Sequence, residues 1–185
     1  MEVMAGNVVT VDAVARLSAC GVDCIRVGIG SGSICTTRLV TGFGYPQLSA
    51  IINTSNLGVP IIADGGIRYS GDIVKALAAG ASAVMVGRLL AGTNETNAPT
   101  IGRKCVYRGM SSASVNSENG KTNVAAEGIK TVVEPKGSVK GVLQELIGGI
   151  RSGLTYCGAR NLTELRSKAK WVKITGASWN ESLAH

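Results

Sequence analysis

Four short apolar runs, separated by helical patterns, constrain the fold more than any other feature of this chain. The runs are residues 3–9, 24–29, 59–63 and 83–86. Each is continuous rather than alternating and is followed by glycine or polar residues, which is typical of strands in a parallel sheet covered on both faces. Four such strand–helix units correspond to half of an eight-stranded (β/α) barrel, in which active sites lie at the carboxyl ends of the strands.

Helical patterns fill the intervals between these runs. Apolar residues at helical spacing predict helices over residues 10–19, 46–53 and 70–79. Thr10 or Asp12 could cap the first helix, Pro46 suits the first turn of the second, and Gly80 closes the third. We therefore expect residues 1–93 to form α/β units of the (β/α)8 TIM-barrel type.

The pattern changes after residue 93. Residues 94–137 are rich in Asn, Ser, Gly, Thr and Lys, and we expect a β-ribbon there with a mobile flap around residues 113–124. Residues 138–185 return to helical periodicity. The expected elements there are helices at 138–152 and 161–168 and a late strand at 171–174. We therefore expect residues 1–185 to form one portion of a single domain, divided at residues 93 and 137.

A loop rich in glycine and hydroxyl groups follows the second apolar run and carries Cys35. Glycines let a backbone approach a ligand closely, and successive loop N–H groups can form an anion-binding concavity. A thiol beside such a cradle suggests covalent chemistry on a phosphorylated metabolite. Taken alone, however, a cysteine in a Gly/Ser loop is more often an ordinary buried residue.

Composition excludes several classes of function. No apolar stretch approaches the roughly 18 residues that span a membrane, and no basic segment precedes an apolar one at the N-terminus. Five cysteines without paired spacing indicate reduced thiols and a cytoplasmic location. The net charge of +7 is scattered and aromatic residues make up only 4%, so we predict a basic site for phosphorylated ligands and no specific nucleic-acid partner. His185 is the only histidine, which excludes a Cys-His pair or a histidine-rich metal site in the body of the chain.

Five blocks in a fixed order resemble the IMP dehydrogenase / GMP reductase family. They are residues 5–9, the cysteine loop through residue 42, residues 63–72, residues 107–110, and residues 148–153 leading on to Glu181 and Ser182. The resemblance implies that the chain begins at the fifth strand of the barrel. The first four strand–helix units are then absent, together with upstream residues that would contact a cofactor.

The resemblance also implies a role for individual residues. Cys35 would attack C2 of a purine mononucleotide, GMP or IMP, with Thr37 and Glu127 handling protons beside the adduct. Asp64 would accept hydrogen bonds from the ribose hydroxyls. Arg88 stands where the family carries a small residue, and it could add a phosphate contact or point away. The phosphate would be held by Ser33, Gly65, Gly66, Gly87 and Tyr107, and the base would be bordered by Asn7, Gly109 and Met110.

The same resemblance implies a cofactor, a cation and an assembly. The cofactor would be NADP or NAD, in contact with Arg26 and Gly28. A potassium ion would be held by carbonyls of the cysteine loop and by Glu181 of a neighbouring subunit in a homo-oligomer, by resemblance a tetramer. The loop carbonyls are those of Gly30, Gly32 and Cys35. Leu183 replaces a family histidine near this cation site.

Two sister activities remain open, and the segment before Glu127 favours one of them. By this resemblance, the dehydrogenase has a long flap that bears an Arg-Tyr pair, which activates water. In this chain only sixteen residues separate Met110 from Glu127, and they contain no Arg-Tyr pair. Residues 45–50 and 109–112 also resemble the reductase, but residues 67–81 and 158–170 resemble the dehydrogenase. We therefore expect GMP reductase, with IMP dehydrogenase as the alternative. An alternative of another class is a catalytically incomplete nucleotide-binding half barrel.

Overall fold

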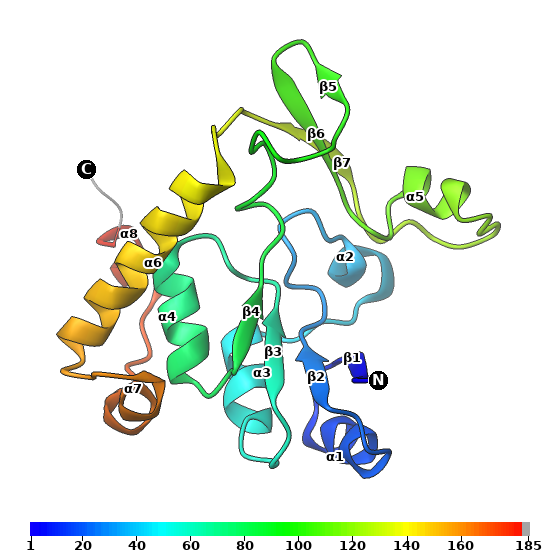
Figure 1. The fold of residues 1–185 in the computed structure, drawn as a ribbon. Helices are drawn as coiled ribbons and strands as arrows, with labels where there is room; N and C mark the ends of the chain where they lie inside the picture. Colours follow the sequence, from blue (N-terminus) through cyan, green and yellow to red (C-terminus); the bar gives the residue numbers. More distant parts are fainter. Residues whose placement is uncertain (183–185) are drawn as a thin grey trace.

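The computed structural model describes residues 1–182, and a parallel four-stranded sheet forms its centre (Figure 1). The strands lie side by side in chain order, β1-β2-β3-β4. Their bounds are Met4–Val8, Cys24–Val27, Ile61–Asp64 and Ala83–Met85. Ile25 lies opposite Ile61, and Ile62 lies opposite Ala83. All four predicted strands are confirmed, each with bounds within two residues of the prediction.

Three helices alternate with these strands. They are α1 (Val11–Ala19), α3 (Gln47–Thr54) and α4 (Ser70–Ala78). The Thr10 hydroxyl caps α1 by accepting from the Ala13 amide, and Pro46 is the N-cap residue of α3. The predicted helices are therefore confirmed. The short helix α2 (Thr37–Thr41) was not predicted; it begins two residues after Cys35 and ends at Gly42, whose φ of 75° needs a glycine.

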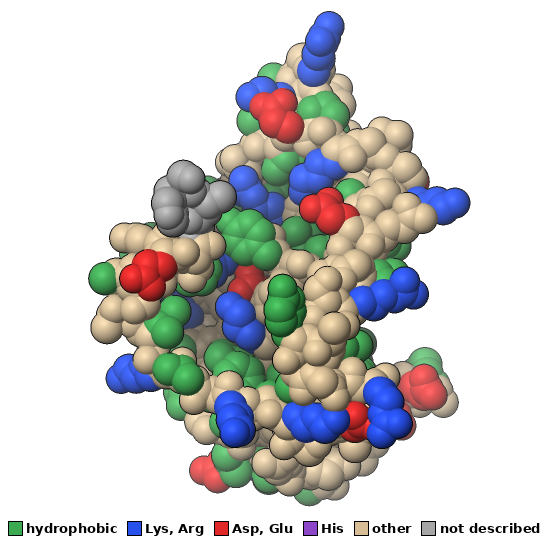
Figure 2. Space-filling model, turned by 90° about the vertical axis from the view of Figure 1, so that its left-hand side faces the viewer, with side chains coloured by type: hydrophobic (Ala, Val, Ile, Leu, Met, Phe, Trp, Pro, Cys, Tyr) green, Lys and Arg blue, Asp and Glu red, His purple; other side chains and the backbone are tan. Residues whose placement is uncertain are grey.

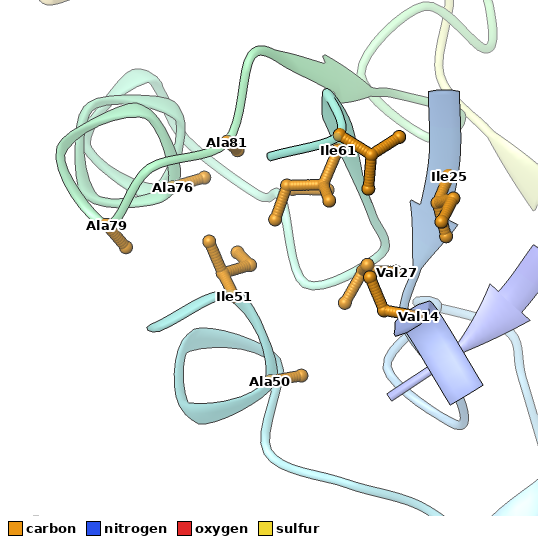
Figure 3. Packing of buried hydrophobic residues seen from close by; sticks show 11 residues of the cluster. Val14, Ile25, Val27, Ala50, Ile51, Ile61, Ala76, Ala79 and Ala81 are labelled. Carbon is orange, nitrogen blue, oxygen red and sulfur yellow. The ribbon is translucent and has the colours of Figure 1, made fainter. Parts of the chain in front are cut away.

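Burial alternates along the two central strands, as it would in a sheet of which one face is covered by the helices of this chain. In β2, Ile25 and Val27 are buried while Arg26 is partly exposed, and β3 shows the same alternation. Figure 3 shows the covered face, where Ile25, Val27 and Ile61 pack against Val14 and Ile51 of α1 and α3. The other face carries Arg26 and Asp64, and no helix of the described chain covers it. The apolar runs thus predicted the strands correctly, and the uncovered face is the one that would line the interior of a complete (β/α) barrel.

An antiparallel sheet interrupts the strand–helix alternation. Its strands pair in the order β5-β6-β7, and in Figure 1 it lies beyond the carboxyl ends of the parallel strands. The bounds are Thr100–Ile101, Lys104–Arg108 and Lys130–Val133. This confirms the predicted β-ribbon. The expected flap contains the helix α5 (Ala113–Glu118), and its mobility stays a prediction.

Helix α6 (Val139–Tyr156) packs along α4 and is longer than predicted. Two glycines permit this close approach: a Cβ added at Gly149 would lie 2.1 Å from the Ser70 hydroxyl, and one at Gly153 would lie 2.7 Å from Val74. Helix α7 (Leu162–Lys168) follows, with the Asn161 side chain as its cap. Figure 2 shows the face that carries these C-terminal helices, over which Lys and Arg side chains are scattered rather than gathered in one patch.

The predicted strand at residues 171–174 is wrong. No strand forms there, and the short helix α8 (Gly176–Asn180) follows instead. Trp171, Val172 and Ile174 are exposed. An isolated β-prone segment gains no ladder hydrogen bonds unless a second strand lies beside it. Within residues 1–182, no helix is long and apolar enough to cross a membrane.

Replacing Ile61 by alanine tests the core. This side chain is 1% exposed on the central strand β3. Because truncation removes buried methyl groups and leaves a cavity, we expect Ile61→Ala to lower the free energy of unfolding by about 2–5 kcal/mol. Ile101→Ala is the matched control, since Ile101 is 59% exposed and its truncation should change stability by less than about 0.5 kcal/mol. Urea unfolding measures both, and equal losses would contradict this assignment of the core.

A carboxylate at the start of α6 predicts how the stability of the chain depends on pH. The Glu95 carboxylate accepts from the Val139 amide at 2.8 Å and from the Ser138 hydroxyl at 2.9 Å, and these bonds lower the pKa of Glu95 below its ordinary 4.5. A lowered folded-state pKa contributes stability above the unfolded-state pKa, and that stability is lost as the pH falls through the folded value. We expect Glu95→Gln to lower the Tm at pH 7 and this deficit to shrink below pH 4.5. Glu145→Gln, at an exposed position of α6, should show neither effect in thermal scans.

Candidate functional site

A cavity of about 740 Å³ opens at the carboxyl ends of β2, β3 and β4. Loops from the parallel sheet form one side, and the segments that flank α5 form the other. The cysteine loop, the Asp64–Arg68 segment and the Gly87–Arg88 turn line the first side, while Tyr107, residues 109–111 and Glu127 line the second. The cavity therefore lies where the barrel pattern predicts a ligand site.

Backbone hydrogen bonds join the cysteine loop to the chain before β7. The Thr36 amide donates to the Glu127 carbonyl at 2.9 Å, and the Ile129 amide donates to the Ile34 carbonyl at 3.0 Å. Cys35 itself forms an isolated antiparallel bridge with Gly128. The thiol is half-buried as a result, fixed in place and open to the cavity.

A chain of side-chain hydrogen bonds runs from this thiol to a carboxylate. The Cys35 Sγ donates to the Thr37 Oγ1 at 3.2 Å, and the Thr37 hydroxyl donates to the Glu127 Oε2 at 2.7 Å. All three residues line the cavity. A hydroxyl that accepts from one neighbour and donates to the next can pass a proton along the chain. The arrangement can thus move the thiol proton toward Glu127.

Asp64 ends β3 and collects two donors. Its Oδ2 accepts from the Arg26 Nη2 and the Asn7 Nδ2, at 2.6 Å and 2.8 Å. Asn7 also donates to the Gly28 carbonyl at 2.8 Å. These bonds orient one carboxylate oxygen and leave the second available for a ligand hydroxyl. The buried Nε of Arg26 has no hydrogen-bond partner among the described residues, and a ligand acceptor in the cavity would satisfy it.

Glycines bring the backbone close to the rest of the cavity. Gly65 has a φ of 95°, and a Cβ added there would lie 2.3 Å from the Ser31 hydroxyl. A Cβ at Gly87 would lie 2.7 Å from the Tyr107 hydroxyl. The positive φ at Gly65 favours glycine, and a side chain at position 87 would displace the Tyr107 hydroxyl. The two glycines leave a concavity between the ends of β3 and β4 with Tyr107 on its far side.

The structure brings most of the predicted site residues to this cavity. Cys35, Thr37, Glu127 and Asp64 line it, as do Arg26 and the remaining residues predicted for phosphate, base and cation. These are Gly30, Gly32, Ser33, Gly65, Gly66, Gly87, Arg88, Tyr107, Gly109 and Met110.

Three predicted residues do not line the cavity. Asn7 contacts Asp64 through a hydrogen bond from its Nδ2 and does not reach the cavity itself. Gly28 is buried, and a Cβ there would lie 2.0 Å from the Asp64 carbonyl oxygen. Glu181 is exposed at the end of α8, and a role for it in a neighbouring subunit stays a prediction. Leu183 lies outside the described residues.

Sequence reasoning missed the part played by Gln47. Its Oε1 accepts from the Ser31 hydroxyl at 3.0 Å and its Nε2 donates to the Val27 carbonyl at 2.7 Å, so it ties the cysteine loop to the end of β2. Gln47 lines the cavity as well. Its position directly after Pro46, at the start of a helix that follows the cysteine loop, was the available signal.

Comparisons with known proteins agree with this geometry. The profile of the IMP dehydrogenase / GMP reductase domain matches residues 1–185. A relative named inosine-5′-monophosphate dehydrogenase, from Aquifex aeolicus, is 50% identical over 202 residues and covers the whole chain. One of the same name from Nitrosopumilus maritimus is 43% identical over 204 residues. The chain spans 41% and 43% of the length of these two relatives.

A solved structure matches the whole chain at a TM-score of 0.95 and 40% identity. It is a cysteine-to-alanine variant of GMP reductase from Trypanosoma brucei in complex with guanosine 5′-monophosphate, and the chain covers 41% of it. This match confirms the predicted TIM-barrel type of fold, of which the present chain supplies a part. With half of the residues identical to one relative and the family profile matched from end to end, the chain belongs to the IMP dehydrogenase / GMP reductase family.

Proposed function

We propose that this chain carries the nucleotide-binding and covalent machinery of a purine-mononucleotide oxidoreductase. The observation that carries the proposal is the hydrogen-bonded series Cys35–Thr37–Glu127 on the wall of the cavity. It supplies a nucleophile, a route for its proton and a carboxylate to receive that proton. Since the chain spans about two-fifths of its relatives, the activity of the whole protein is part of the proposal.

The cavity has groups suited to each part of a mononucleotide. Asp64 would accept from the ribose hydroxyls. The Gly66 amide itself donates to the Ser31 carbonyl at 2.9 Å, so the Gly87 amide and the hydroxyls of Ser33 and Tyr107 would hold the phosphate, with Gly65 and Gly66 beside it. Arg88 lines the same part of the cavity. The cavity volume of about 740 Å³ is in the ordinary range for small-molecule sites. The Trypanosoma brucei relative was solved with GMP, which supports a purine ligand here.

The reductase reaction fits the residues of this chain best. The thiolate of Cys35 would bond to C2 of GMP, the bond from C2 to the exocyclic nitrogen would break, and that nitrogen would take up protons and leave as ammonia. Thr37 and Glu127 would move the protons. No step up to this point requires an activated water. The short segment between Met110 and Glu127, which lacks an Arg-Tyr pair, is therefore compatible with this chemistry.

The second candidate is IMP dehydrogenase, in which water replaces sulfur at C2 and must be activated. The curated relatives with 43% to 50% identity carry that name, and this favours it. The Aquifex aeolicus match runs over 202 residues against 185 here, so that relative has additional residues within the matched region. We favour the reductase because the segment after Met110 offers no evident water-activating pair.

Of the two residues predicted to contact a nicotinamide dinucleotide, one is in a position to do so. Arg26 lines the cavity and has an unpartnered Nε, whereas Gly28 is buried. When bound, NADPH would supply the hydride that replaces sulfur at C2, which releases IMP and returns the thiolate to Cys35. Further contacts to the cofactor would come from outside this chain.

The proposal extends to a bound potassium ion, to a homo-oligomeric assembly and to a cytoplasmic location. The Gly32 carbonyl accepts from the Cys35 amide at 3.2 Å, and it would share a potassium ion with the carbonyls of Gly30 and Cys35. Glu181 of a neighbouring subunit would complete the site in a tetramer. All five cysteines are free, which supports a cytoplasmic location.

The two sister reactions are separated by their substrates. The chain is incubated with GMP and NADPH, and separately with IMP and NAD, while the absorbance of the reduced nicotinamide is followed. Loss of absorbance with GMP supports the reductase, and a gain with IMP supports the dehydrogenase. Nucleotide binding without either change would support the incomplete half barrel, which lacks what the remainder of the barrel supplies.

Replacing Cys35 by serine tests the covalent step. Because a hydroxyl is a much poorer nucleophile at C2 than a thiolate, we expect Cys35→Ser to lower kcat by at least about 10³-fold while GMP still binds. Cys105→Ser is the control, since Cys105 lies in β6 outside the cavity and should keep its activity. Intact-mass spectrometry of the GMP-treated chain should show an adduct only where Cys35 is present. Full turnover by Cys35→Ser would refute the covalent mechanism.

Replacing Thr37 by valine tests the proton route. Valine keeps the shape of the side chain but breaks both hydrogen bonds that link Cys35 to Glu127. We expect kcat to fall by about 10²- to 10⁴-fold with a much smaller change in KM. Thr36→Val is the matched control, because the Thr36 side chain makes no capping hydrogen bond and does not line the cavity. A change confined to KM would count against this route.

A further inference from the structure

The segment between β7 and α6 lies directly against the chain that follows β4. The Lys136 amide donates to the Gly92 carbonyl at 2.8 Å, and the Asn94 amide donates to the Gly137 carbonyl at 2.8 Å. A Cβ added at Gly92 would lie 2.5 Å from the Glu134 carbonyl oxygen. The two backbones are therefore in close contact, and neither can move here without the other.

The side chain of Lys136 extends this contact to the turn that borders the cavity. Its Nζ donates to the Arg88 carbonyl at 2.6 Å and to the Leu89 carbonyl at 3.0 Å. The same turn is closed by the Leu90 amide, which donates to the Gly87 carbonyl at 3.0 Å. The ammonium group thus holds two successive carbonyls immediately after Gly87 and satisfies them with charge-assisted bonds.

Two positive charges meet at this turn. Desolvation lowers the pKa of Lys136, and the charge of Arg88 lowers it further. Over residues 1–182, no carboxylate forms an ion pair with either side chain, although seven such pairs occur elsewhere. Like charges placed together without a counter-charge are unfavourable. An anion bound at Gly87 and Arg88 would remove this penalty.

We propose that Lys136 is a positioning residue for phosphate-bearing ligands, which holds the Gly87–Leu90 turn through the carbonyls of Arg88 and Leu89 so that Arg88 and the Gly87 amide face the phosphate. Lys136 does not itself line the cavity, so it acts through the turn rather than by contact. This inference deepens the proposed function and rests on it for the identity of the ligand. It needs only an anionic group at the turn, and no particular reaction.

The test compares ligands with and without a phosphate. Dissociation constants of GMP, guanosine and inorganic phosphate are measured by calorimetry for the unmodified chain, Lys136→Met and Lys136→Arg. We expect Lys136→Met to weaken GMP and phosphate about tenfold and to change guanosine less than about twofold. Lys136→Arg keeps the charge and should retain most of the GMP affinity. Lys140→Met, an exposed lysine of α6, should behave as the unmodified chain.

Steady-state kinetics and thermal unfolding complete the test. Where turnover is measurable, we expect Lys136→Met to raise KM for GMP with little change in kcat, and a Tm close to that of the unmodified chain would exclude general unfolding. Equal losses for GMP and guanosine would overturn the proposal, as would unchanged GMP affinity. If Lys136→Met does not fold, failure of Lys136→Arg to retain GMP affinity would overturn it. Phosphate binding without turnover would count only against the proposed reaction, and no phosphate binding by the unmodified chain would overturn the present inference.

Discussion

The pairing of the cysteine loop with residues 127–129 is the contact on which the rest of the site depends. Two backbone hydrogen bonds and the bridge between Cys35 and Gly128 join segments about ninety residues apart. Gly128 is buried, and a Cβ there would lie 3.4 Å from Gly109. This pairing places the Glu127 carboxylate within reach of Thr37 and closes one side of the cavity. Without it, the thiol would lie on an open loop, and Thr37 would have no carboxylate to which it could donate.

The remaining groups divide between two faces of the same sheet. The apolar residues of β2 and β3 pack under α1 and α3, while the alternate positions carry Arg26 and Asp64 toward the cavity. Because side chains alternate along a strand, one set of residues stabilises the fold and the other faces the cavity. At the end of β4, Lys136 connects the antiparallel sheet to the Gly87–Leu90 turn. The residues after β4 therefore contribute both to the side of the cavity that holds Glu127 and to the side formed by the Gly87–Leu90 turn.

Local patterns predicted those elements whose residues carry a clear apolar run or helical periodicity with capping residues at the ends. The four strands and their helices followed from apolar runs, a Thr10 cap and Pro46 at a helix start. The same reasoning failed at residues 171–174, where a β-prone run has no strand beside it. It also missed α2, a helix of five residues held in place by Gly42 and by the contacts of the cysteine loop. Strands need partners that a local pattern does not reveal, and very short helices leave too few residues for a periodicity to show.

Sequence alone determined the family, the order of the blocks and the residue types at the site. Cys35 in its glycine loop, the Asp64-Gly65-Gly66 turn and Glu127 could be predicted as site residues from the resemblance of five ordered blocks to one family, whereas each of them alone has commoner structural uses. Tertiary structure alone decided how they meet. Thr37 donates to Glu127, Asn7 and Arg26 donate to Asp64, and Lys136 donates to the Arg88 carbonyl. These hydrogen bonds join residues 38 to 90 positions apart, and only the Cys35–Thr37 contact is local. The pairs on Asp64 depend on the register of three strands within one sheet, and the other two depend on how the antiparallel sheet and its flanking loops lie against the parallel sheet. No local pattern encodes either.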